Sequence, residues 1–372
     1  MAELLQKKFK LMIIKVDPVQ VGEKIDQALK ILKKGGIAAF PTDTVYGLGI
    51  NAEDQRAVSK LYKIKKRPKE KPLILFLSKK EQIFPFVKIF PIQAQRLINR
   101  YWPGPLTLLF KANIPSSSPL VSKEGKIGIR IPSHPIPREI VQRSDFSLGT
   151  TSANISGKPE IINPKRLSPE LIRGVNVLLD GGDALLGKVS TVVDVTSFPP
   201  QTIREGWISR EEIMKVERGE GKILFVCTGN TCRSPMAEAF FKKSWPQKPK
   251  EKIKVKSAGT NAIANSKPSE FATKVMREKG IDISSHRATP LTPEIVKEYD
   301  LILTMEERHR QRVINLFPFI REKVWLLSEF ISGKKEDILD PAGSYLSTYR
   351  ELALRIEKEI NKLMERLGGE SE

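Results

Sequence analysis

Cys227 and Arg233 stand six positions apart, at the two ends of a loop that could bind and attack a phosphate group. The loop follows an apolar run, residues 223–226, that is typical of a β-strand, and a helix is predicted to begin at Ser234 and Pro235. Loop amides and the helix dipole would then converge on one anion. Arg233 could bind two phosphate oxygens, while a Cys227 thiol whose pKa these groups lower could attack phosphorus. The pattern predicts phosphoryl transfer to a thiol, because the loop lacks the Lys-Ser/Thr pair of a nucleotide-binding P-loop.

The segment VCTGNTCRSPMAEA, residues 226–239, resembles the signature of the low-molecular-weight protein-tyrosine phosphatase family. Four further segments occur in the family's order, SAGT, GIDISSHRA, DLILTM and LDPAG, beginning at residues 257, 280, 300 and 339. The resemblance covers residues 222–372 and implies a doubly wound parallel sheet. It also implies that Cys227 is the nucleophile, that Arg233 binds phosphate and that Asp340 is the general acid. Cys232 would trap oxidised Cys227 as a disulfide.

The same resemblance implies a set of residues that support the phosphate loop. Asn230 would be held in a left-handed conformation by hydrogen bonds to Ser234, Ser257 and His286, since a residue other than glycine needs such support. Ser234 would additionally stabilise the thiolate. Thr231 completes the set at the pocket wall.

Two positions leave the phosphatase substrate open between phosphoarginine, phosphotyrosine and small phosphate esters. Ala342 stands where relatives usually have an aromatic residue that packs on the substrate ring. Thr231 stands where tyrosine phosphatases commonly have an aliphatic residue, and here the sequence is similar to the protein-arginine phosphatase branch. A hydroxyl can contact a guanidinium group, which an aliphatic side chain cannot. Arsenate reduction is excluded because it needs cysteines beyond this loop.

The composition restricts the class of protein. The 372 residues include 63 Lys and Arg against 43 Asp and Glu, and residues 1–220, with 36 basic and 22 acidic residues, have a net charge of +14. This charge favours polyanions such as nucleotides or RNA. Two cysteines in one loop and three scattered histidines provide neither a disulfide framework nor zinc-ligand spacing, so no metal is expected. Without a signal-peptide core or a membrane span, a cytoplasmic location is expected.

Short apolar strands alternate with amphipathic helices in the first 210 residues. A helix is predicted over 19–34, between strands at 11–16 and 37–40. Seven more strands are expected at 73–77, 106–111, 126–131, 148–151, 175–179, 191–195 and 202–204. These are too many for a five-stranded Rossmann sheet and predict a large, twisted, mixed α/β sheet. We expect domains at 1–210 and 222–372, joined by a charged linker at 211–221.

Polar motifs follow several of these strands. PTDTVYGLG occupies 41–49, KIKKRPKEKPL 63–73, TSANISG 151–157, STVVD 190–194 and IREG 203–206. Together with WPGPLT at 102–107 and RIP at 130–132, they resemble the YrdC-like family of threonylcarbamoyl-AMP synthases over residues 11–215. The resemblance implies that L-threonine, bicarbonate and ATP condense into threonylcarbamoyl-AMP and pyrophosphate, the first step toward threonylcarbamoyladenosine in tRNA.

The YrdC-like motifs carry candidate ligand-binding residues. ATP, with Mg²⁺ bridging its phosphates, would be held by the KxR pair, the SxN pair and one further arginine, namely Lys65, Arg67, Ser152, Asn154 and Arg204. Threonine would be held by the remaining motif residues, namely Thr42, Tyr46, Arg130 and Ser190. Arg130 is the natural partner for its carboxylate. Such a reaction needs cations and alignment more than acids or bases.

The sequence thus predicts a bifunctional enzyme, a threonylcarbamoyl-AMP synthase fused to a cysteine-dependent phosphatase that needs no cofactor. Its expected partners are L-threonine, bicarbonate, ATP, phosphorylated proteins and, downstream, tRNA and tRNA-modification proteins. The alternative is an RNA-binding YrdC-like module without synthase activity, fused to a tyrosine phosphatase, which the +14 charge would suit. The intact KxR, SxN and PTDT motifs favour the synthase, because RNA binding alone would not require them.

Overall fold

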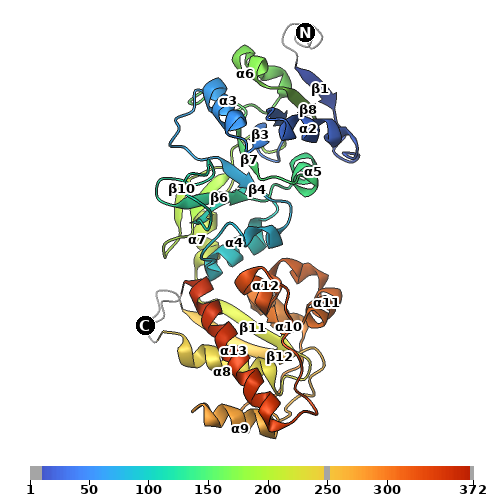
Figure 1. Cartoon of the computed structure of the whole chain (residues 1–372), viewed down its shortest axis with the longest axis vertical. Coiled ribbons are helices and arrows are strands. Elements are labelled where there is room, and N and C mark those ends of the chain that lie inside the picture. The colour runs from blue at the N-terminus through green and yellow to red at the C-terminus, as the bar shows by residue number, and fades with distance from the viewer. Residues whose placement is uncertain (1–10, 247–251, 369–372) are drawn as a thin grey trace. The chain divides into compact units, whose positions relative to one another are not determined.

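The computed structural model describes residues 11–246 and 252–368. The chain divides into two compact units (Figure 1). Each unit has its own hydrophobic core. The first contains residues 11–88 and Arg100–Glu217, and the second contains Ile89–Asn99 with residues 218–246 and 252–368. No helix within the described ranges has both the length and the apolar character needed to cross a membrane.

The first unit is built on one ten-stranded sheet. Its strands are β1 (Met12–Lys15), β2 (Ala38–Phe40), β3 (Gly47–Asn51), β4 (Ile74–Phe76), β5 (Leu106–Lys111), β6 (Lys126–Arg130), β7 (Leu148–Ser152), β8 (Val177–Asp180), β9 (Thr191–Asp194) and β10 (Gln201–Arg204). They lie in the order β1-β8-β2-β3-β7-β4-β6-β5-β9-β10. The pairs β1/β8, β2/β8, β4/β6 and β5/β9 are parallel and the other five are antiparallel. The predicted mixed sheet is confirmed.

Helices cover this sheet and bury its apolar face. They are α2 (Lys24–Lys33), α3 (Gln55–Lys65), α5 (Pro135–Arg143), α6 (Pro169–Gly174) and α7 (Arg210–Glu217), with 3₁₀ turns η1 (Lys80–Ile83) and η2 (Pro164–Arg166). Helix α4 (Ile92–Tyr101) falls mostly in the second unit. Ile25 and Leu32 of α2 pack with Ile136 of α5 against Phe40 and Leu179 of the sheet. Helix α7 occupies most of the segment predicted to be a linker.

Strand β3 is the element that the sequence analysis missed. No strand is predicted from the sequence over residues 47–51, GLGIN, which include two glycines, a residue type depleted in strands. In the structure β3 pairs antiparallel with both β2 and β7, and Gly47 lies opposite Ser152. A Cβ atom on Gly49 would lie 2.6 Å from the ring of Phe40, so glycine here makes room for a buried aromatic side chain.

The second unit is a three-layer α/β/α fold. Its strands β11 (Gly221–Cys227), β12 (Ile253–Gly259), β13 (Leu301–Thr304) and β14 (Val324–Leu326) are all parallel, in the order β12-β11-β13-β14. Its helices are α8 (Arg233–Ser244), α9 (Glu270–Glu278), α10 (Pro293–Glu298), α11 (Glu307–Leu316), η3 (Pro318–Lys323), α12 (Leu327–Ser332) and α13 (Leu346–Leu367). The predicted doubly wound parallel sheet is confirmed.

The two faces of this sheet bury alternate residues of each strand. Leu224 and Val226 of β11 join a cluster with residues of α10, α11 and η3. Phe225 points the other way, and its ring lies 6.3 Å from that of Phe241 on α8. Helix α13, the long red helix in Figure 1, packs against α8, α9 and α12. Because β11 has β12 on one side and β13 on the other, the loop after it lies where the strand order reverses, which is the usual ligand-binding position in such folds.

We predict that Gly206→Ala destabilises the first unit. A Cβ atom there would lie 2.2 Å from the carbonyl oxygen of Val189 and 2.6 Å from the amide nitrogen of Thr191, so backbone must shift. Overpacking of this kind typically lowers the free energy of unfolding by about 1–3 kcal/mol. Urea unfolding of the full chain measures the effect. Gly47→Ala is the matched control, since its Cβ would meet its nearest atom at an ordinary 3.5 Å. Equal losses in the two variants would contradict the explanation.

Candidate active sites

The loop predicted to bind phosphate connects β11 to α8. Cys227 is the last residue of the strand and Arg233 is the first of the helix. The Cys227 Sγ atom lies 3.0 Å from Ser234 Oγ and accepts a hydrogen bond from the Asn230 amide at 3.3 Å. The thiol is buried. Strand, loop and helix thus place the sulfur beside the backbone amide of Asn230 and the hydroxyl of Ser234.

Burial raises the pKa of the Cys227 thiol, and this effect exceeds the opposing effects of Ser234, Arg233 and the Asn230 amide. The sequence analysis counted only the groups that favour the thiolate and left out the cost of placing a charge in a buried site. The groups that it named do lower the thiol pKa, but burial outweighs them, so the net direction differs from the one expected.

Asn230 adopts the left-handed conformation, with φ of 55°. Its side-chain amide donates to Ser234 Oγ and Ser257 Oγ, both at 2.9 Å, and His286 Nε2 lies 2.9 Å from its carbonyl oxygen. The structure thus brings together the four residues that the sequence placed here. It adds Glu238, whose carboxylate accepts a 2.6 Å hydrogen bond from Ser257 and leaves the serine oxygen free to accept from Asn230.

The guanidinium of Arg233 is almost fully buried, with 1% of the side chain exposed. Its Nη1 atom donates to the Ile338 carbonyl at 2.9 Å and lies 3.1 Å from Glu306 Oε1. Its Nη2 atom donates to Asp340 Oδ2. Asp340, the predicted general acid, is 32% exposed, so it contacts both the phosphate-binding arginine and solvent.

Three further residues of this site were not singled out from the sequence: Thr228, Glu306 and His309. His309 Nε2 lies 2.8 Å from Thr228 Oγ1 and 3.3 Å from Glu306 Oε2. Burial and the charge of Arg233 lower the pKa of His309 to about 4. Although burial opposes it, Arg308 and Arg233 lower the pKa of Glu306, which is an anion at neutral pH. Glu306 directly follows the DLILTM motif, so the end of that buried strand was the available signal.

The residues proposed to set specificity lie around the loop. Thr231 is half-buried, and its hydroxyl lies 3.7 Å from Cys232 Sγ, which also lies 3.1 Å from Ser269 Oγ. Ala342 is exposed and its amide donates to Asp340 Oδ1 at 3.2 Å. The ring of Tyr345 is also exposed, with 84% accessible. No aromatic side chain is therefore contributed by the position after the DP pair.

In the first unit, α3 delivers the KxR motif. Asp54 caps the start of α3 by accepting from two amides, and the helix ends at Lys65 because Lys66 is left-handed, with φ of 51°. Lys65 Nζ donates to the carbonyl oxygens of Ser152 and Asn154 and lies 3.3 Å from Asn154 Oδ1. The KxR lysine and the SxN pair therefore form one cluster. Burial, followed by the charge of Arg67, lowers the pKa of Lys65 to about 7.

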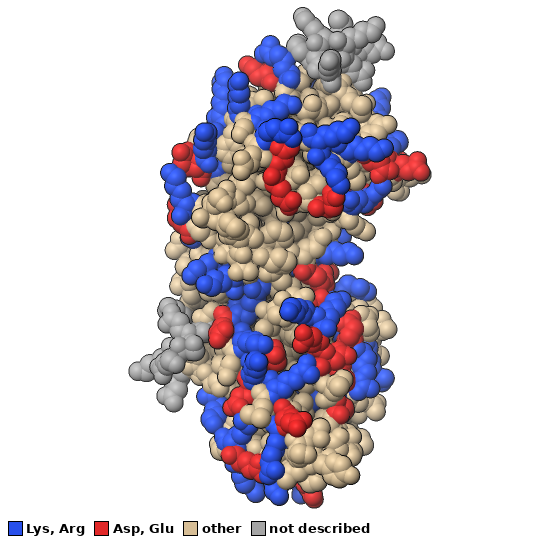
Figure 2. Space-filling view, viewed as in Figure 1, with Lys and Arg blue, Asp and Glu red and all other residues tan. Residues whose placement is uncertain are grey.

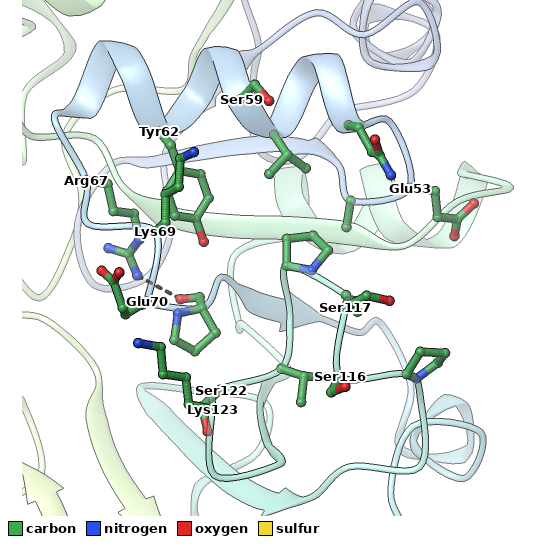
Figure 3. Close-up of a pocket in the computed structure, with 18 of the residues that line it drawn as sticks. Glu53, Ser59, Tyr62, Arg67, Lys69, Glu70, Ser116, Ser117, Ser122 and Lys123 are labelled. Carbon is green, nitrogen blue, oxygen red and sulfur yellow. Dashed lines mark hydrogen bonds between the residues drawn. The ribbon is translucent and has the colours of Figure 1, made fainter.

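Arg67 lies in the wall of a pocket of about 1110 Å³ between α3 and the segment 115–123. Its Nη2 atom donates to the Pro72 carbonyl at 2.7 Å, drawn as a dashed line in Figure 3, and its Nη1 atom donates to Thr151 Oγ1 at 3.3 Å. Lys69 and Lys123 add positive charge to the lining and Glu70 adds negative charge (Figure 3). The pocket combines cations with hydroxyl groups and the ring of Tyr62.

The guanidinium of Arg130 forms hydrogen bonds to the PTDT motif. It donates to Asp43 Oδ2 at 2.8 Å, to Thr44 Oγ1 at 3.0 Å and to the Gly104 carbonyl at 2.9 Å. Thr42 and Thr44 share a hydroxyl hydrogen bond of 2.8 Å. Arg130 and Thr42 are thus brought together through Asp43 and Thr44. The sequence analysis quoted this motif but gave Asp43 no role.

The other two proposed threonine ligands, Ser190 and Tyr46, form hydrogen bonds to different partners. Ser190 Oγ is 2.9 Å from Thr107 Oγ1, and Arg204 donates to the Ser190 carbonyl at 2.9 Å and to its hydroxyl at 3.2 Å. Tyr46 is fully buried and donates to the Gly182 carbonyl at 2.6 Å, while burial raises its pKa. The structure therefore links Ser190 to Arg204, whereas the hydroxyl of Tyr46 bonds to Gly182 and not to another predicted ligand.

The charged side chains of the proposed ATP and threonine site affect one another's pKa. Burial lowers the pKa of Arg204, and the charges of Arg130 and Arg67 add to this effect, whereas Glu160 opposes it. The arginines that the sequence placed in one site are thus close enough to repel one another, as expected of a site for a polyanion. Within residues 11–246 and 252–368, no three His, Cys, Asp or Glu side chains are placed to hold a metal ion.

Comparison with known proteins finds two family models that match the chain. Residues 30–206 match the Sua5/YciO/YrdC family model, described as "Telomere recombination", and residues 222–372 match the model "Low molecular weight phosphotyrosine protein phosphatase". Threonylcarbamoyl-AMP synthase of Pyrococcus abyssi is 35% identical over 203 residues, which are 53% of this chain and 60% of that protein. The chain therefore spans little more than half the length of the first synthase relatives that it matches.

The second unit has a relative that it matches almost from end to end. Protein-arginine-phosphatase of Bacillus subtilis is 39% identical over 145 residues, which are 39% of this chain and 95% of that protein. A solved structure of a variant of P. abyssi Sua5 aligns with 85% of this chain and 98% of its own, at 26% identity and a TM-score of 0.50. Both resemblances drawn from the sequence are confirmed. The chain belongs to the Sua5/YciO/YrdC family in its N-terminal part and to the low molecular weight phosphotyrosine protein phosphatase family in its C-terminal part.

Proposed function

We propose that the second unit is a cysteine-dependent phosphatase. The observation that supports this most directly is the convergence of Cys227, Arg233 and Asp340 on one loop, with Arg233 in contact with Asp340. Arg233 and the loop amides hold the phosphoryl oxygens. Cys227 reacts as the thiolate after its thiol proton has passed to the Asp340 carboxylate. The sulfur bonds to phosphorus while the bond to the leaving group breaks, and Asp340 gives that proton to the leaving group.

The second half of this reaction returns the enzyme to its starting state. Asp340, now a carboxylate, takes a proton from a water molecule, which attacks the phosphorus of the cysteinyl-phosphate. The sulfur–phosphorus bond breaks, inorganic phosphate leaves and the electron pair returns to Cys227. Because burial raises the thiol pKa, the Ser234 hydroxyl has a specific role in stabilising the thiolate that leaves.

We propose phosphoarginine as the preferred substrate. The Thr231 hydroxyl offers a hydrogen-bond acceptor to a guanidinium group, and exposed Ala342 provides no ring for a phenol to pack against. Asp340 would protonate the nitrogen of the phosphoramidate bond as this bond breaks. The end-to-end relative named as a protein-arginine-phosphatase supports this choice over phosphotyrosine and small phosphate esters.

We propose that the first unit forms threonylcarbamoyl-AMP and pyrophosphate from L-threonine, bicarbonate and Mg–ATP. The supporting observation is the cluster in which Lys65 binds Ser152 and Asn154, next to the pocket that Arg67 lines. Lys65, Arg67 and Arg204 neutralise phosphate charge, and an arriving polyanion favours the protonated form of Lys65. Since these groups are cations, Mg²⁺ enters as part of the nucleotide substrate.

The threonine side of this site is proposed to use Thr42, Tyr46, Arg130 and Ser190. The pairing of Arg130 with Asp43 changes its expected role. We propose that Arg130 orients Thr44 and contributes positive charge, and that the Ser190 hydroxyl contacts the amino acid. Thr42, whose hydroxyl donates to the Val45 carbonyl at 2.7 Å, holds the turn that carries these residues. Tyr46, whose hydroxyl donates to the Gly182 carbonyl, contributes to the buried wall of the site and does not bind the amino acid through its hydroxyl.

The charge pattern supports a small polyanion as partner. On the face seen in Figure 2, Lys and Arg side chains are interspersed with Asp and Glu side chains. The cations that converge are the buried arginines and lysine of the motif cluster.

We propose that threonylcarbamoyl-AMP passes to tRNA-modification proteins, and that phosphorylated proteins are the substrates of the second unit.

Cys227→Ser should abolish phosphatase turnover, because a serine hydroxyl at this position is a much weaker nucleophile and leaving group. Cys232→Ser should retain most of it, since a serine there can keep the contact with Ser269. Hydrolysis of a phosphorylated peptide by the full chain measures both. Pyrophosphate release should be unchanged in each variant. Equal loss of turnover in the two variants would remove Cys227 as the unique nucleophile.

Replacing both Lys65 and Arg67 with Ala should cut ATP- and threonine-dependent pyrophosphate release at least about a hundredfold, because each lost contact to developing charge typically costs about 2–4 kcal/mol. Lys165→Ala, on the exposed surface of the same unit, is the control. Circular dichroism establishes that the variants are folded. Normal release in the folded double variant would show that the motif is not part of the reaction. RNA binding by a wild type that releases no pyrophosphate would favour the RNA-binding alternative.

The kcat/KM for phosphoarginine peptides should exceed that for phosphotyrosine peptides of the same sequence, and Thr231→Ile should shift the ratio toward phosphotyrosine. The reason is that an aliphatic side chain removes the hydroxyl that contacts the guanidinium group. Thr273→Ile, on α9, is a control for the size of the substitution. A wild type that prefers phosphotyrosine tenfold or more, equivalent to about 1.4 kcal/mol in transition-state binding, would overturn the arginine assignment.

A further inference from the structure

The hydroxyl of Thr228 has two neighbours that leave it few choices of hydrogen bond. Arg233 Nη2 donates to Thr228 Oγ1 at 3.4 Å, and a guanidinium group can only donate. The other neighbour is His309 Nε2, at 2.8 Å. Whether the hydroxyl gives or receives this second hydrogen bond depends on which ring nitrogen of His309 carries the proton.

The surroundings of His309 determine the tautomer. Its Nε2 atom also lies 3.3 Å from Glu306 Oε2, and a carboxylate can only accept. A proton on Nε2 therefore satisfies both neighbours, whereas a lone pair there would face the carboxylate. The Nδ1 atom is buried and has no hydrogen-bond partner among the described residues, which suits an unprotonated nitrogen better than an N–H group. Burial and Arg233 keep the ring neutral by lowering its pKa to about 4.

With Nε2 protonated, His309 and Arg233 occupy both lone pairs of Thr228 Oγ1. The hydroxyl proton is then available to a third group. The position of this third group is indicated by Arg233. Its Nη1 and Nη2 atoms form hydrogen bonds, but its Nε atom is buried and has no hydrogen-bond partner among the described residues. Nε and Nη2 form the edge of a guanidinium that binds two oxygens of a phosphate. An anion on this edge lies beside Nη2, and hence beside Thr228 Oγ1 and Asp340.

We propose that Thr228 is a further catalytic residue of the phosphatase, donating its hydroxyl proton to a phosphoryl oxygen, and that His309 is the positioning residue that directs this proton toward the substrate. The inference rests on the phosphatase activity proposed above. No bond is made or broken at either residue. The donor is most useful when charge builds up on the phosphoryl oxygens, so its loss lowers kcat more than it raises KM.

Thr228→Val tests the donor in the full chain, because valine has nearly the shape of threonine and lacks the hydroxyl. With 4-nitrophenyl phosphate as substrate, we expect kcat/KM to fall about tenfold to a hundredfold, mainly through kcat, as is usual for one donor to a charged transition state. Thr228→Ser keeps the hydroxyl and should recover most of the activity. Thr304→Val is the matched control, since it removes a buried hydroxyl that donates to the Trp325 carbonyl and should leave kcat/KM unchanged.

A double-variant cycle tests His309. His309→Leu should lower kcat/KM, and His309→Gln should restore part of it, because a glutamine amide can donate near the position of Nε2. In the Thr228→Val background, His309→Leu should cost about fivefold less than in wild type, since the hydroxyl that it directs is already missing. Equal costs in both backgrounds would overturn the positioning role. Unfolding experiments on each variant separate these effects from a loss of folded protein.

Binding of tungstate, an inorganic phosphate analogue, separates this inference from the activity on which it rests. A wild type that neither binds tungstate nor hydrolyses the substrate would overturn the phosphatase and this inference together. An active wild type with unchanged turnover in Thr228→Val would overturn this inference alone. The expected result is an active wild type that binds tungstate, with weaker binding in Thr228→Val and normal binding in Thr304→Val.

Discussion

The burial of the Arg233 guanidinium is the constraint on which the phosphatase site depends. A cation removed from water is tolerated only if it is paired and hydrogen-bonded, and arginine cannot lose its proton to escape the cost. Glu306 and Asp340 provide the two carboxylates, one two residues after the end of β13 and the other in the loop that precedes α13. The short phosphate loop is therefore held by segments more than 70 residues away in sequence. Its shape depends on the whole second unit.

Lys65 in the first unit is also a buried cation, but a different feature lowers the free-energy cost of burying it. It is buried to the same degree, with 1% exposed, but its ammonium group bonds to carbonyl and amide oxygens, and the charge of Glu160 raises its pKa by less than burial and Arg67 lower it. Because lysine can give up its proton, burial lowers its pKa to about 7. Since no carboxylate of the described residues forms an ion pair with Lys65, this lysine keeps its attraction for a nucleotide. Arg233, by contrast, uses its carboxylate Asp340 as the proposed acid, so the structural counter-ion and the proton donor are one residue.

The sequence could predict most of the secondary structure and the motif residues, but not the contacts between them. Nine strands of the first unit follow from apolar runs, whereas β3 was missed because Gly49 serves packing and not a turn. Asn230 and its partners were identified through family resemblance. Glu306, His309 and Glu238 were not, because each is an ordinary surface-type residue in sequence and becomes part of the site only through tertiary packing. The raised pKa of Cys227 was missed for the same reason, since burial is a property of the fold.

Hydrogen bonds within the protein distinguish motif residues that can still bind a ligand from those that are already committed. Tyr46 and Arg130 carry the side chains that a sequence motif would assign to threonine, yet their polar groups are buried and bonded to Gly182 and Asp43. Arg233 is equally buried but keeps a donor, Nε, with no partner in the described part of the chain. Leaving a buried donor unpaired costs free energy in the absence of ligand. That cost is recovered when an anion binds, so an unpaired donor beside a nucleophile is stronger evidence for a binding site than the identity of the residue alone.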